Sequence, residues 1–96
     1  MRRLRSEKLV MRFVLKFLED TNMEDLRTAL AAGDQDGAFR AAHTLKGLCL
    51  NIGFTRLGES SSQLTEALRA GIPAHALMEQ TEADYEELVQ AIRALH

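Results

Sequence analysis

Apolar residues recur at helical spacing along nearly the whole chain, and short connections separate the segments that carry them. The longest stripe begins at Ala74 and keeps apolar or small residues on one face for about six turns, as far as Leu95. No segment shows the alternation of apolar and polar residues that is typical of a strand. Because helices joined by two to four residues pack as antiparallel neighbours, the pattern predicts an all-α, antiparallel up-and-down four-helix bundle with a short additional N-terminal helix.

Glycine, proline and capping residues mark where the expected helices begin and end. The five expected helices run from about residue 4 to 19, through residues 23 to 30, from about 36 to 52, from 55 to about 70, and from 74 to 95. Gly33 suits the end of the second, and either Asp34 or Asp36 can cap the third. Gly53 follows the third helix as its expected C-terminal stop.

Composition fits a single folded domain. The chain has 96 residues, of which 46% are hydrophobic and 27% charged, so we expect one domain over residues 1–96. The net charge of -2 argues against a nucleic-acid partner, and no apolar run has the length of a membrane span. Cys49 has no second cysteine with which to form a disulfide. We therefore expect a cytoplasmic monomer without nucleic-acid or membrane partners.

The segment "AAHTLKGLCLNIG", residues 41–53, combines a helical pattern with residues that a plain helix does not need. Placed at 100° per residue, its apolar stripe comprises Ala38, Ala41, Ala42, Leu45, Cys49 and Ile52. His43 lies nearly opposite the centre of that stripe, with Arg40 and Gly47 beside it. We therefore expect His43 to face solvent or a shallow groove next to a neighbouring helix.

The three residue types around this position suit phosphoryl chemistry. A neutral imidazole nitrogen of His43 is a good nucleophile and can hold a phosphoryl group. Lys46 lies one turn further on, where its ammonium group can compensate phosphoryl charge. Gly47 costs the helix about 1 kcal/mol relative to alanine but clears space beside the ring for a second protein. A mid-helix glycine could instead allow close packing against another helix, so both interpretations of Gly47 stand.

Two apolar residues, Phe39 and Leu50, flank the side of the helix that carries His43, and they also have two interpretations. Phe39 and Leu50 either pack on neighbouring helices or, with Arg40, form an exposed docking patch. Around His43 the sequence has no phosphate-binding glycine loop, no paired carboxylates and no ATP motif. The chain therefore offers a nucleophile without the machinery of a kinase.

The string "AAHTLKGLCLNIGFTRL" resembles the signature of histidine-containing phosphotransfer (HPt) domains, A-H-x-L-K-G followed by small and apolar residues and a glycine. His43, Lys46 and Gly47 fall on the hallmark positions, and Gly53 falls on the glycine that ends the helix. A weaker similarity extends from about Phe13 to Leu95.

The resemblance implies a carrier in a two-component phosphorelay. His43 would accept a phosphoryl group from an aspartyl phosphate, on the receiver domain of a response regulator or hybrid histidine kinase, and pass it to another receiver aspartate. Lys46 would compensate phosphoryl charge and Gly47 would give the receiver access. The receiver would supply Mg²⁺, so we expect no cofactor, no metal site and no kinase activity in this chain.

One departure from the family pattern concerns the next helix. Many HPt domains carry Gln or Glu about 22 residues after the histidine, where it contacts the imidazole, and here that position is Thr65. Thr65, or the nearby Gln63, is the candidate for orienting the ring. Two alternative functions remain open: a non-phosphorylated helical adaptor that binds receivers, and the phosphotransfer segment of a chemotaxis-type kinase.

Overall fold

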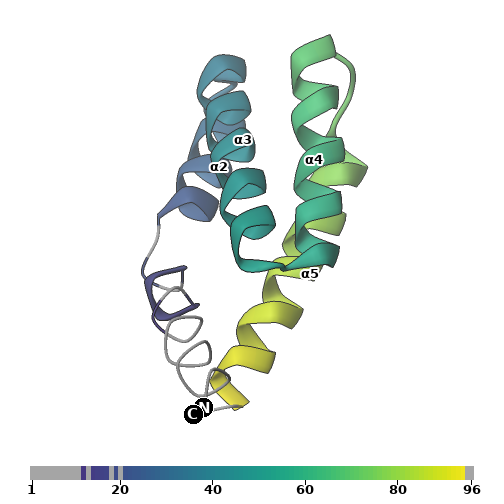
Figure 1. Ribbon diagram of the computed structural model, residues 1–96. Coiled ribbons are helices and arrows are strands. Elements are labelled where there is room, and N and C mark those ends of the chain that lie inside the picture. Colours follow the sequence, from purple (N-terminus) through teal and green to yellow (C-terminus); the bar gives the residue numbers. More distant parts are fainter. Residues whose placement is uncertain (1–11, 13, 18, 20, 95–96) are drawn as a thin grey trace.

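The structure, a computed structural model, describes residues 12, 14–17, 19 and 21–94. Its four long helices are α2 (Asn22–Ala31), α3 (Gln35–Ile52), α4 (Thr55–Ala70) and α5 (His75–Ala94) (Figure 1). The described residues before Thr21 are also helical, and no described residue belongs to a strand. The all-α prediction is confirmed for the described residues, whereas residues 4–11, 13 and 18 of the expected first helix lie outside the described part.

Local signals in the sequence account for the two ends of α3. The Asp34 side chain accepts a hydrogen bond from the Gly37 amide at 3.0 Å, so Asp34 is the N-cap of the two candidates. At the other end Gly53 has φ of 92°, a left-handed conformation in which its amide bonds the Cys49 carbonyl at 2.8 Å. The chain reverses there, and α4 begins two residues later.

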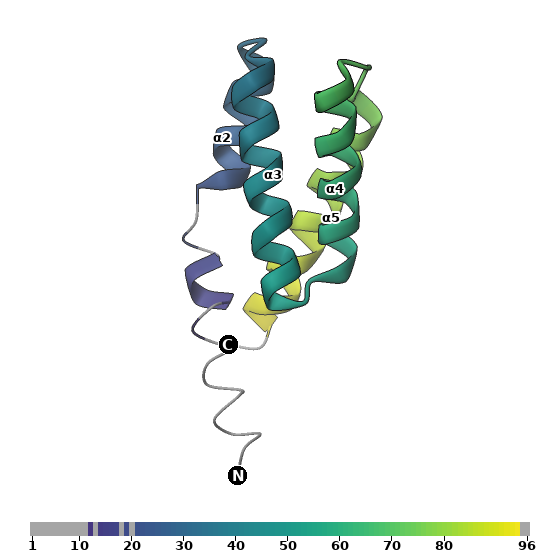
Figure 2. The ribbon, with the colours of Figure 1, turned by 45° about the horizontal axis from the view of Figure 1, so that its top comes forward.

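Helices α3 and α4 pack side by side and antiparallel (Figure 2). Gln35 at the start of α3 donates to the Leu68 carbonyl near the end of α4 at 2.8 Å. Near the other end, a Cβ placed on Gly58 of α4 would lie 3.5 Å from the Cys49 Cβ of α3. In both views α2 lies along α3 and α5 lies along α4, which leaves one side of α3 uncovered by these helices.

The core lies between the helices and includes most of the predicted stripe of α3. Ala38, Ala41, Ala42, Leu45 and Cys49 are buried, and Ile52 is half-buried. Fully burying a leucine such as Leu45 contributes about 2 kcal/mol, so this stripe fixes which face of α3 points outward. Burial also raises the pKa of the Cys49 thiol to about 12, because the thiolate would lose its hydration.

Among the described residues before Thr21, Phe17 makes aromatic contacts with the bundle. Phe17 is buried, with its ring centroid 5.3 Å from that of Phe54, in an edge-on arrangement. The Tyr85 ring lies 6.0 Å away on α5. Phe17 therefore joins the turn between α3 and α4 to the last helix.

Arg27 of α2 links that helix to α5. Its Nε and Nη2 atoms donate to Oε2 and Oε1 of the Glu82 carboxylate at 3.0 Å and 2.6 Å, and its guanidinium lies 5.7 Å from the centroid of the Tyr85 ring. The hydrogen bonds with Glu82 raise the pKa of Arg27 further above its ordinary value. Two parallel bonds of this kind are stronger and more directional than a single surface ion pair.

We expect Arg27→Ala to lower the free energy of unfolding by about 1 kcal/mol, the upper range for a partly solvated pair. Urea denaturation followed by circular dichroism measures the change. The matched control is Arg56→Ala, which removes an ion pair to Glu87 whose partners are 70% and 65% exposed. Its loss should cost less than about 0.5 kcal/mol. Equal losses in the two variants would contradict a linking role for Arg27.

Candidate functional site

His43 lies in the middle of α3 on the face that the other helices leave open. Its neighbours Ala42 and Leu45 are buried in the core, while His43 itself is exposed. Among the described residues neither imidazole nitrogen has a hydrogen-bond partner; the contact the ring makes is with Phe39. The prediction that His43 faces outward is confirmed, and its side chain is accessible from solvent.

Gly47 leaves an open space one turn after His43. It is exposed, and a Cβ placed on it would meet no described atom of another residue within 4 Å outside its immediate helix backbone. No described helix therefore packs closely against this position. This geometry removes the interpretation in which Gly47 serves close helix packing within the described chain.

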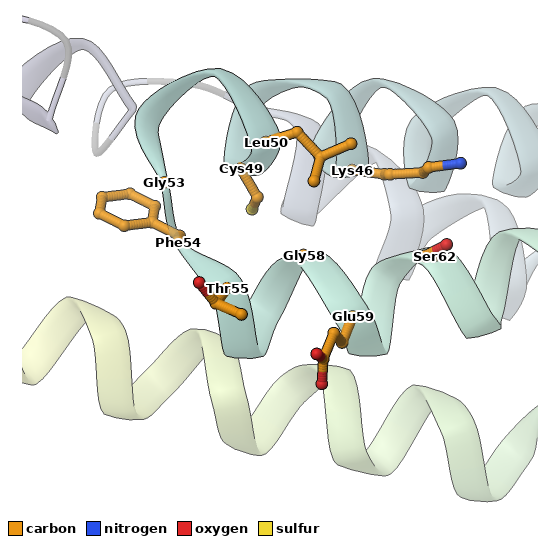
Figure 3. A pocket seen from close by; sticks show the side chains of 9 residues that line it. All are labelled: Lys46, Cys49, Leu50, Gly53, Phe54, Thr55, Gly58, Glu59 and Ser62. Carbon is orange, nitrogen blue, oxygen red and sulfur yellow. The ribbon is translucent and has the colours of Figure 1, made fainter.

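Lys46 lies at the edge of a groove between α3 and α4 (Figure 3). This α3–α4 groove, of about 350 Å³, is lined by Lys46, Cys49, Leu50, Gly53, Phe54, Thr55, Gly58, Glu59 and Ser62. The Lys46 side chain extends away from Gly53, towards the N-terminal half of α3 that carries His43.

Neither Thr65 nor Gln63 of α4 makes the hydrogen bond to His43 that would orient its ring. Thr65 is fully buried, and its hydroxyl donates to the Ser61 carbonyl at 2.7 Å. Gln63 is exposed, and within the described residues no hydrogen bond joins either side chain to His43. The role suggested for them stays a prediction.

A comparison with protein-family models shows to which family the chain belongs. The model of the Hpt domain matches residues 13–96, which include α2 to α5 and the whole segment around His43. The chain belongs to the Hpt domain family. Searches of curated proteins and of solved structures found no match. Hpt domains are phosphocarrier modules of two-component signalling rather than kinases, and they interact with receiver domains and kinases.

The expected docking residues of this Hpt domain lie along α3 on both sides of His43. Leu50 is 64% exposed, one of the large apolar side chains that the fold leaves in solvent. Arg40 is exposed and lies 3.6 Å from Asp36 in an ion pair along the helix. Phe39 is half-buried and packs against the core. Leu50 and Arg40 are therefore accessible, whereas Phe39 is shared between core and surface.

The contacts of Phe39 with His43 and Arg69 were not predicted from the sequence. The rings of Phe39 and His43 are stacked, and the guanidinium of Arg69 on α4 lies 5.7 Å from the Phe39 centroid. The spacing of four residues between Phe39 and His43 was the available signal, because such residues meet on one helix face. Arg69 has no comparable local signal.

Metal ligation and membrane insertion find no support among the described residues. In that part of the chain, no three His, Cys, Asp or Glu side chains gather where they could hold a metal ion. Nor does any described helix combine the length and the apolar character needed to cross a bilayer.

Proposed function

We propose that this Hpt domain accepts a phosphoryl group on His43 from a receiver-domain aspartyl phosphate and passes it to another receiver aspartate. The observation that carries the proposal is the exposed imidazole, whose nitrogens have no hydrogen-bond partner among the described residues, beside the open position at Gly47. Membership of the Hpt domain family supports it.

The chemistry needs little from the chain itself. An imidazole nitrogen of His43 attacks the phosphorus atom, a P–N bond forms, and the P–O bond to the aspartate breaks as the carboxylate leaves. The reverse reaction with a second receiver returns the phosphoryl group to an aspartate. Lys46 is proposed to offset charge on the phosphoryl oxygens, and the Mg²⁺ that assists such transfers is expected on the receiver.

The receiver is proposed to dock on the uncovered face of α3. Leu50 and the α3–α4 groove offer it apolar surface on one side of His43, and the exposed Arg40 lies on the other. Specific recognition by a small patch of this kind suits the brief contact that a carrier makes with each partner. We further propose that the domain acts as a cytoplasmic monomer with no kinase activity of its own.

The finer architecture is proposed to be the antiparallel up-and-down four-helix bundle with an additional short N-terminal helix. The antiparallel contacts of α3 with α4, and the packing of α2 on α3 and of α5 on α4, support it. In such a bundle one central helix can present a polar side chain without exposing the core.

Incubation with a receiver carrying labelled aspartyl phosphate tests the function. We expect the label to move to this domain as an acid-labile, base-stable phosphate, and to leave again when a second unphosphorylated receiver is added. A complex with the receiver that forms without any transfer would favour the adaptor alternative. If the domain neither binds nor exchanges phosphoryl groups with any receiver of a panel, that result would contradict the proposal.

Lys46→Ala should bind receivers almost as well as the unaltered domain yet transfer the phosphoryl group about tenfold more slowly. The reason is that the ammonium group is proposed to act on charge at the phosphoryl oxygens, where a lost electrostatic contact lowers the rate. Rapid-quench kinetics at saturating phosphorylated receiver measures the step, and Lys46→Arg, which keeps the charge, should recover part of it. An unchanged rate in Lys46→Ala would remove Lys46 from the site.

A further inference from the structure

Phe39 lies one helical turn before His43, and the two rings form a stacked pair. Their centroids are 6.0 Å apart and their planes differ by 11°. Nearly parallel rings at this separation are in the offset-stacked arrangement that aromatic groups prefer. The Phe39 ring is therefore in a position to select one orientation of the imidazole.

Phe39 is itself held from two directions. It packs against the buried core, which restrains its side chain on α3. The Arg69 guanidinium of α4 lies 5.7 Å from its ring centroid, within the range of a cation–π contact, and Arg69 also lies 3.7 Å from Glu66 in a surface ion pair. A ring fixed by two helices is a firmer support for His43 than a free surface side chain.

No other described group performs this task for the imidazole. Thr65 donates its hydroxyl to Ser61, and His43 has no hydrogen bond to any described residue. The stack also acts through the faces of the ring, whereas phosphoryl transfer occurs at nitrogens on its edge. The same contact can therefore hold the imidazole before and after it is phosphorylated.

We propose that Phe39, supported by Arg69, is the positioning residue that sets the plane of the His43 ring for phosphoryl transfer. The inference rests on the proposed function of His43. Phe39 does not touch the phosphoryl group; it reduces the number of ring orientations that an approaching receiver meets. Rates depend strongly on such alignment of the reacting atoms, so loss of the stack should slow the transfer step itself.

Nuclear magnetic resonance tests the stack without any phosphotransfer. The carbon-bound ring protons of His43, assigned by their absence in His43→Gln, should be shifted upfield by the Phe39 ring. Phe39→Leu should remove that shift, while Phe39→Tyr, which keeps the ring, should retain it. Circular dichroism and the Tm of each variant show that the domain is folded. An unchanged His43 spectrum in folded Phe39→Leu would overturn the proposal.

Single-turnover transfer from a phosphorylated receiver, measured over a range of Hpt domain concentrations, separates positioning from docking. Phe39→Leu should lower the maximal rate about three- to tenfold, the factor that corresponds to losing a stacked aromatic pair. The half-saturating concentration should change less than about twofold, and Phe39→Tyr should restore the rate. Arg69→Met, which removes only the cation, should have a smaller effect in the same direction.

Three outcomes of the transfer assay would overturn the proposal. A raised half-saturating concentration with an unchanged maximal rate would make Phe39 a docking residue instead. Equal rates in the unaltered domain and Phe39→Leu would leave the function of His43 intact and remove the role of Phe39. If the unaltered domain transfers no phosphoryl group, the proposed function fails and the positioning role falls with it, whatever the spectra show of the stack.

Discussion

A His43→Gln protein is expected to take up no phosphoryl group from a phosphorylated receiver, while its helix content and Tm stay close to those of the unaltered domain. Glutamine has no nucleophilic nitrogen of this kind, so the P–N bond cannot form. His43 is exposed and its ring contacts Phe39 without entering the core, so folding depends little on it. Labelled transfer assays and thermal melts followed by circular dichroism measure both quantities.

His75→Gln is the matched control, since it removes an imidazole from another helix of the same domain. The His75 side chain is 90% exposed and pairs with Glu79 at 2.9 Å, far along the chain from the α3 site. This variant should take up the label at the normal rate. Full labelling of His43→Gln would show that the acceptor is a different residue, and a large loss of helicity would show that His43 is structural.

The features that the sequence predicts well are those that depend on neighbouring residues. The expected third and fourth helices, 36–52 and 55–70, agree with α3 and α4 to within one residue at each end. Asp34 and Gly53 act within a few residues of their own positions, as a side-chain cap and as a left-handed stop. The buried stripe of α3 likewise follows from helical geometry alone, and it fixes His43 on the opposite side.

Contacts between α3 and α4 are predicted less well from the sequence. Counting about 22 residues from His43 identifies Thr65, but the count does not give the rotation of α4 about its axis. Packing sets that rotation, and it buries Thr65, whose hydroxyl bonds Ser61. The contact of Arg69 with Phe39 joins two helices in the same way, so no local pattern predicts it. Residues 4–11, 13 and 18 of the expected first helix cannot be compared, because they lie outside the described part.

Gly47 should lower the stability of α3 while leaving room for a receiver to approach His43, and two substitutions separate these effects. Gly47→Ala is expected to raise the free energy of unfolding by up to about 1 kcal/mol, because alanine is the better helix former. The added methyl group would meet no described atom of another residue within 4 Å outside its immediate helix backbone, so it should cause no clash. Urea denaturation measures the gain, and phosphotransfer should fall only slightly.

Gly47→Leu should keep the domain folded but slow phosphoryl transfer from a receiver by about a hundredfold, because a leucine beside His43 occupies space that the incoming aspartyl phosphate needs.

The matched control is Gly58→Leu on α4. Gly58 is buried, and a Cβ placed on it would lie only 3.5 Å from the Cys49 Cβ, so a leucine there should overpack the helix contact and cost about 2 kcal/mol or more. Transfer assays and denaturation on both variants distinguish the two glycines. If Gly47→Leu were as destabilising as Gly58→Leu, then Gly47 would serve helix packing, and the argument from access would fail.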